Sequence, residues 1–243
     1  MDVNFRGILN METLELGELI CSVKRSYRRT VCIRVGKDGT AEILAPTRIS
    51  LKKIKELMLP YSDKISVQCE RQRLRNTQRE SFFLDYGSKV RFLGREAEIR
   101  DGMGHDVGID GDTVYLPPSL SREEIRQSMI DVYKISAREY LTKRTAELSE
   151  AAGIFPNAVK INSATSHWAS MSRKNSLNFS WFCIMADPEA IDYIIIHELC
   201  HMKEFNHSPR FWKMVSVYCP DYNKHRKYLK ELWCRVLSEN WEK

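Results

Sequence analysis

The chain has 243 residues, enough for one large domain or two small ones, and its 43% hydrophobic content can build a sizeable core. A net charge of +6 and a pI near 8.9 indicate a mildly basic, solvated surface rather than a dedicated polyanion-binding protein. No stretch approaches the roughly 18 apolar residues of a membrane span. The first 20 residues contain acids and no apolar run, so we expect neither a membrane anchor nor a secretory signal.

The cysteine content points to a reducing environment. Seven cysteines occur, an odd number, without a C-x-x-C pair, and most lie in apolar stretches. Such a pattern predicts reduced thiols in a cytoplasmic protein rather than a disulfide framework. No internal repeat or low-complexity tract is visible.

Residues 1–118 are predicted to form a β-rich N-terminal region. Strands are expected within 11–46, where 31–35 and 41–44 flank the turn cluster Gly36-Lys-Asp-Gly39 and form a hairpin. A short basic helix follows from Leu51 to about Met58. Further strand signals lie at 82–86, 90–93, 97–100 and 114–116, with glycine-rich loops at 102–104 and 108–112.

The stretch from residue 62 to 80 is polar and rich in arginine. A nucleic-acid contact would favour aromatic side chains interleaved with the cations, because bases stack on aromatic rings. None is interleaved here, so we predict a solvated helix or a linker.

Residues 119–243 are predicted to be mainly helical. The capping box Ser121-Arg-Glu-Glu124 begins a long amphipathic helix that ends at Gly153. Its predicted buried side comprises Ile125, Met129, Val132, Ile135, Tyr140 and Leu148. Strands at 159–162 and 177–179 enclose a loop at 167–171. The fold class is therefore α+β, a β-rich layer followed by a helical half, expected to form one compact unit.

The segment His197-Glu-Leu-Cys-His201 is an H-E-x-x-H motif, a metallopeptidase signature when it lies on a helix. Asp187 suits an N-cap and Pro188 the first helical position. Residues four apart on a helix have Cβ atoms roughly 5–6 Å apart, so His197 and His201 can bind one ion. Imidazole ligands favour Zn²⁺, and Glu198 can reach a water on the metal without being a ligand.

A catalytic zinc commonly has three protein ligands, and His207 is the predicted third. The chain must turn between Glu204 and His207, and the Ser208-Pro209 pair supports this as the start of a new helix, about Pro209 to Tyr218. His225, on a last helix from about Tyr222 to Glu239, and His105, in a glycine-rich loop, are the alternatives. Cys200 faces another side of the metal helix and is expected to pack in the core.

The segment 191–201, with Asn206-His207-Ser208 and Phe211-Trp212, resembles the YgjP-like (DUF45) zinc metallopeptidases, which are related to the SprT-like proteins. The resemblance covers about Tyr27 to Leu237. It implies a zincin-like catalytic half, one zinc ion on His197, His201 and His207, a catalytic Glu198, and a substrate-binding strand within 159–181.

One stretch departs from the family pattern. The family usually has Arg-Trp-Gly-Ser-Cys upstream of the metal helix, whereas this chain has His167-Trp-Ala-Ser-Met171. Only Trp168 and Ser170 match, so substrate contacts of the other three positions are not carried over.

These residues predict hydrolysis of a peptide or protein substrate by a zinc-activated water, with Glu198 as the general base. His167 and Tyr222 are candidate donors to the oxyanion, and with Trp168 and Ser170 they form the predicted substrate-binding set. The candidates for orienting the ligand imidazoles are Asp192, Glu204 and Asp221.

Two other functions remain open. A metal-dependent phosphohydrolase acting on nucleotides would suit the positive charge, although no phosphate-binding glycine motif is present. A non-catalytic, zinc-stabilised module that binds nucleic acid or protein is the second, and Glu198 argues against it because a structural zinc needs no general base.

Overall fold

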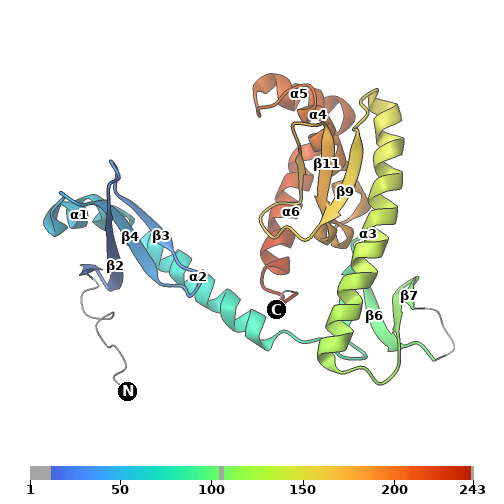
Figure 1. Cartoon of the computed structure of the whole chain (residues 1–243), viewed down its shortest axis with the longest axis horizontal. Coiled ribbons are helices and arrows are strands. Elements are labelled where there is room, and N and C mark those ends of the chain that lie inside the picture. Colours follow the sequence, from blue (N-terminus) through green and yellow to red (C-terminus); the bar gives the residue numbers. More distant parts are fainter. Residues whose placement is uncertain (1–11, 104–106, 242–243) are drawn as a thin grey trace, which may run out of the picture. The chain divides into compact units, whose positions relative to one another are not determined.

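The computed structural model describes residues 12–103 and 107–241. The chain divides into two compact units, Met1–Ser81 and Phe82–Lys243 (Figure 1). Each unit has its own hydrophobic core. The boundary predicted after residue 118 lies inside the second unit, because the strands before it share one core with the long helix after it. The fold class is α+β, as predicted.

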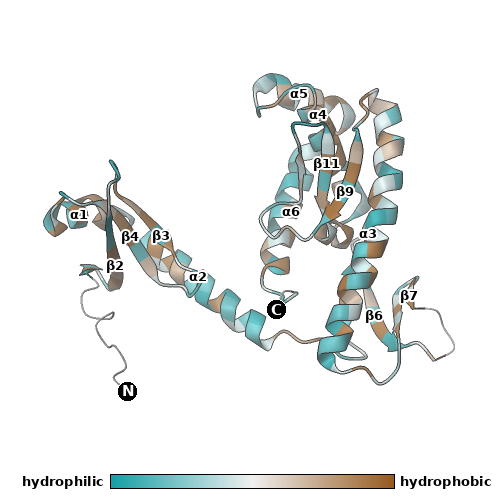
Figure 2. Ribbon diagram, viewed as in Figure 1, coloured by the Kyte–Doolittle hydropathy of each residue, from teal (hydrophilic) through white to brown (hydrophobic). Residues whose placement is uncertain are grey.

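The first unit is a four-stranded sheet with two helices. Its elements are β1 (Glu12–Leu16), β2 (Leu19–Ser26), β3 (Cys32–Val35), β4 (Ala41–Pro46), α1 (Leu51–Met58), the 3-10 turn η2 (Leu59–Tyr61) and α2 (Ser62–Ser81). The predicted hairpin is the antiparallel pair β3–β4. The arginine-rich stretch is the helix α2, which is largely hydrophilic (Figure 2). Leu16, Ile43 and Ile54 form the centre of the core.

The second unit begins with another four-stranded sheet. Its strands are β5 (Lys89–Phe92), β6 (Arg95–Asp101), β7 (Gly108–Asp110) and β8 (Thr113–Leu116). Residues 82–86 were predicted as a strand, but they form no part of any of these strands. The Phe82 ring packs against Trp241 instead. Conversely, β7 forms where a loop was expected, because Gly111 at φ +56° allows a tight turn into β8.

The two sheets repeat the same topology. Their strand orders are β1-β2-β4-β3 and β5-β6-β8-β7. In each, the central pair is parallel and both outer pairs are antiparallel. A helix with a serine N-cap follows each sheet, at Ser50 and Ser121. The sequence shows no visible repeat, but the topology of the two sheets is repeated.

The helix α3 (Arg122–Ala152) has the predicted capping box and ends at Gly153, whose φ is +64°. Ile125 and Met129 are buried as predicted, but Ile135 is 60% exposed. The buried side continues through Ala137 and Leu141 instead. Neither α3 nor any other helix within the described residues is long and apolar enough to cross a membrane.

A three-stranded sheet and three helices complete the second unit. They are β9 (Ala158–Asn162), β10 (Ala169–Met171), β11 (Ser176–Ser180), the 3-10 turn η3 (Trp181–Met185), α4 (Pro188–His201), α5 (Pro209–Tyr218) and α6 (Tyr222–Val236). The order is β10-β11-β9, so β10 is an edge strand. It lies in the predicted loop 167–171 and pairs antiparallel with β11. The helix α4 contacts β10, α3, α5 and α6.

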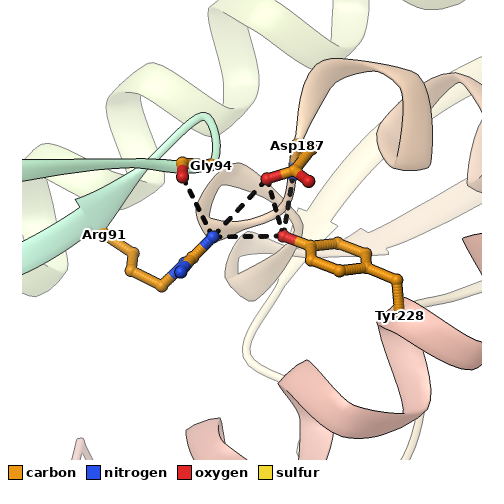
Figure 3. Close-up of polar contacts among 4 residues, drawn as sticks. All are labelled: Arg91, Gly94, Asp187 and Tyr228. Carbon is orange, nitrogen blue, oxygen red and sulfur yellow. Dashed lines mark hydrogen bonds and ion pairs between the residues drawn. The ribbon is translucent and has the colours of Figure 1, made fainter.

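The start of α4 is fixed by a polar network (Figure 3). Asp187 occupies the N-cap position, but its side chain makes no cap hydrogen bond. Its carboxylate instead accepts from the Tyr228 hydroxyl at 2.8 Å and faces the Arg91 guanidinium at 3.5 Å. The same guanidinium donates to the Gly94 carbonyl at 3.0 Å. The network joins the β5–β6 turn, α4 and α6.

Candidate metal centre

Three imidazoles converge at the C-terminal end of α4. His197 and His201 lie one turn apart on this helix, and His207 follows it. Their Nε2 atoms are 3.2 Å apart for His197–His201, 3.2 Å for His201–His207 and 3.1 Å for His197–His207. Among the described residues they form a group of three side chains able to hold a metal ion.

The turn after α4 positions His207. The helix ends at His201, and Ser208 starts α5 by accepting a hydrogen bond from the Phe211 N–H at 3.3 Å. The His207 ring stacks on Trp212, with 5.4 Å between ring centroids. The buried Phe211 ring stacks on His201 at 4.4 Å. Aromatic side chains of α5 thus support two of the three imidazoles.

The two alternative ligands lie elsewhere. The His225 ring faces Tyr193 at 6.3 Å and is not in the three-imidazole cluster. His105 lies outside the described residues.

The hydrogen bonds of the Nδ1 atoms decide the tautomers. His201 Nδ1 lies 3.0 Å from the Glu204 carbonyl oxygen, which can only accept, so Nδ1 carries the proton and Nε2 has a free lone pair. His197 Nδ1 lies 3.3 Å from the Tyr193 hydroxyl. With its proton on Nδ1 donated to that oxygen, His197 also presents a lone pair to the cluster.

Sequence reasoning missed Tyr193 as an orienting residue. Two of the three carboxylates considered from sequence are engaged in other contacts: Asp192 pairs with Arg144 at 2.7 Å and Glu204 with Arg210 at 2.9 Å. The available signal was the spacing of Tyr193, four residues before His197 on one face of α4.

The donor set fits a zinc ion. At about 2.0–2.1 Å per Zn–N bond in a tetrahedral site, ligand nitrogens lie roughly 3.3 Å apart. The observed separations of 3.1–3.2 Å match this spacing. Burial, together with the neighbouring His201, His207 and Arg226, lowers the pKa of His197 to about 3. The imidazole is therefore neutral, the form that binds metal.

Glu198 lies beside the cluster in a cleft of about 410 Å³. Its side chain is buried, with 7% of the residue exposed. Burial raises the pKa of its carboxyl group to about 7, while a hydrogen bond from the Met171 backbone N–H acts to lower it. A carboxyl group with a pKa near neutrality can both accept and donate a proton.

The predicted substrate-binding residues do not all line one pocket. Ser170 on β10 lines the cleft, together with Ala169 and Met171. His167 and Trp168 line a neighbouring pocket. Tyr222 stacks on Trp212 at 5.1 Å and is absent from the lining of both.

Comparison with known proteins gives distant structural likenesses. The metallopeptidase zymogen abylysin of Pyrococcus abyssi is 21% identical over 37% of this chain and 90% of its own, with a TM-score of 0.35. The metallopeptidase zymogen jannalysin of Methanocaldococcus jannaschii is 24% identical over 38% and 96%, with a TM-score of 0.33. At these TM-scores the likeness supports no conclusion about this chain. No curated protein matches it.

The sequence itself matches a protein family over most of its length. The pattern described as "YgjP-like, metallopeptidase domain" matches residues 29–232. This span includes β3 to β11, the three imidazoles and Glu198. The chain belongs to the YgjP-like metallopeptidase family.

Proposed function

We propose that the protein is a zinc-dependent peptidase, in which His197, His201 and His207 hold one zinc ion and Glu198 is the general base. The observation that carries the proposal is the convergence of three Nε2 atoms within 3.2 Å of one another beside a buried carboxyl group. Family membership supports peptide-bond hydrolysis as the activity.

The residues around the three imidazoles have different roles in the proposed reaction. Zinc, when bound, supplies a Lewis acid that makes water nucleophilic near neutral pH and polarises a carbonyl group. Glu198 takes the proton of the attacking water and returns it to the leaving amine. The Met171 N–H holds the Glu198 carboxylate. The edge strand β10 offers main-chain groups to an extended substrate, a mode of binding with little sequence preference.

The test joins metal analysis to a substrate screen. We expect about one zinc per chain by mass spectrometry, loss of peptide cleavage after chelation, and its return with added Zn²⁺. A peptide mixture analysed by mass spectrometry would reveal the products. Hydrolysis of a nucleotide with Mg²⁺ or Mn²⁺, without cleavage of any peptide, would overturn the proposal in favour of a phosphohydrolase.

A further inference from the structure

A second pocket, also of about 410 Å³, lies beside the metal cleft. It has aromatic walls from Trp168 and Trp233, whose rings meet edge to face at 4.4 Å. Arg226 and Lys230 of α6 and His167 add positive or protonatable groups, and its lining contains no Asp or Glu. Neither the metal ligands nor Glu198 line it, and its lining meets the metal centre through Tyr193, the hydrogen-bond partner of His197.

Arg226 is the best-placed cation of this pocket. Its guanidinium lies over the Trp212 ring, 4.4 Å from the centroid, and Trp212 in turn stacks on His207. No ion pair in the described part of the chain includes Arg226 or Lys230. The guanidinium is thus held in place by an aromatic face while its hydrogen-bond donors have no carboxylate partner.

The pocket and the metal cleft are connected along one stretch of backbone. Residues 166–168 line the pocket, and residues 169–171, which form β10, line the metal cleft. An extended chain advances about 3.3 Å per residue along a strand. A peptide paired with the free edge of β10 would therefore reach the pocket within about two to three residues of the metal centre.

We propose that this pocket binds the C-terminal carboxylate of a peptide substrate, with Arg226 as its principal partner and the two tryptophans as walls for the last side chain. The proposal rests on the proposed peptidase function and makes the protein a peptidase that removes short C-terminal fragments. A planar guanidinium matches a carboxylate through paired hydrogen bonds. Lys230 adds a second positive charge at the rim.

A nucleotide phosphate fits the pocket less well. Phosphate sites typically use backbone N–H groups of glycine-rich loops or helix N-termini. The pocket lining contains no glycine, and Arg226 and Lys230 lie within α6 rather than at its first turn.

The kinetic test compares one acetylated hexapeptide of Ala and Phe as its free acid and as its C-terminal amide. With wild-type protein loaded with zinc, we expect a lower KM for the acid, and cleavage within the last three residues as read by mass spectrometry. Arg226→Gln should raise the KM for the acid by about ten- to a hundredfold, the size typical of a hydrogen bond to a charged group. The KM for the amide should change much less, and any change in kcat should be the same for acid and amide, because Arg226 also borders the metal centre through Trp212.

The control is Lys227→Gln, a cation that follows Arg226 on α6, is exposed, and lies outside the pocket lining. It changes the net charge equally, so its kinetics should match the wild type. Equal KM values for acid and amide, with no response to Arg226→Gln, would overturn the subsite while leaving the peptidase function intact.

A binding measurement separates failure of the subsite from failure of the peptidase. Trp168 and Trp233 line the pocket, so tryptophan fluorescence can report binding to the zinc-loaded Glu198→Gln protein, which keeps the pocket intact. We expect the acid to bind more tightly than the amide, and only when Arg226 is present. That result without cleavage by wild type would retain the subsite and reject the peptidase. Arg226-dependent binding of ATP, with none of the acid peptide, would reject the carboxylate assignment.

Discussion

The Tyr193 hydroxyl lies 3.3 Å from Nδ1 of His197, one helical turn further along α4. This contact holds the His197 ring and its tautomer, as outer-sphere partners of metal ligands do. Tyr193→Phe removes the acceptor and leaves the Nδ1 proton unpaired in a largely buried site. We expect zinc affinity to fall about tenfold or more, measured by competition with a fluorescent chelator.

The matched control is Tyr218→Phe. This change removes a hydroxyl that donates to the Ala152 carbonyl, away from the imidazole cluster. Zinc affinity should then equal that of the wild type. Equal affinity in both variants would show that Tyr193 does not position the ligand.

A second prediction concerns the third ligand. His207→Ala should abolish binding of the single zinc ion at neutral pH, because two imidazoles alone hold zinc weakly. His225→Ala should retain it, since the His225 ring faces Tyr193 and stands outside the cluster. Metal content after gel filtration distinguishes the two. The reverse pattern would reassign the third ligand.

A third prediction concerns Glu198. The change Glu198→Gln preserves the size of the side chain but removes the proton acceptor. We expect one zinc ion per chain to remain and peptide hydrolysis to fall by about a hundredfold or more, the usual contribution of a general base. The measurement is kcat on the best peptide from the screen. Retained turnover with zinc bound would refute the assigned base.

A fourth prediction concerns the approach of Gly94 to the start of α4. Gly94 has a φ of +79°, and a Cβ there would collide with the Asp187 side chain and lie 3.0 Å from its Cα. Gly94→Ala should lower the free energy of unfolding by at least about 2 kcal/mol, through backbone strain and overpacking. Thermal or urea unfolding of the full chain measures it.

Gly87→Ala separates the two causes. Gly87 has a φ of +86° but nothing within 4 Å of an added Cβ. Only backbone strain applies there, so we expect a loss of about 1 kcal/mol. Similar losses at both glycines would mean that the contact with Asp187 contributes nothing.

Local signals in the sequence were sufficient for the elements around the metal centre. The Ser121 capping box, the left-handed Gly153 and the Ser208-Pro209 start of α5 each act through neighbouring backbone groups, and all three are present as predicted. The observed bounds of α5 agree with the predicted ones for the same reason. The turn that brings His207 to α4 could be argued from these residues alone.

Features that depend on distant partners could not be read in this way. Asp187 is a good N-cap residue, but Tyr228 and Arg91 compete for its carboxylate. Residues 169–171 of the predicted loop became the strand β10 because β11 pairs with them. Ile135 faces solvent since the buried side of α3 is set by the sheets packed against it. Periodicity along one segment contains no information on these partners.

The repeated sheet topology has a consequence for the order of folding. The first sheet closes between residues 12 and 46 and the second between 89 and 116, so both are assembled from contacts that are local in sequence. Such contacts form quickly, and during synthesis the N-terminal segments emerge first. The imidazoles at 197, 201 and 207 follow both sheets in the sequence and are synthesised after them. A growing chain thus presents the strands of both sheets before it presents the imidazoles that would hold a metal ion.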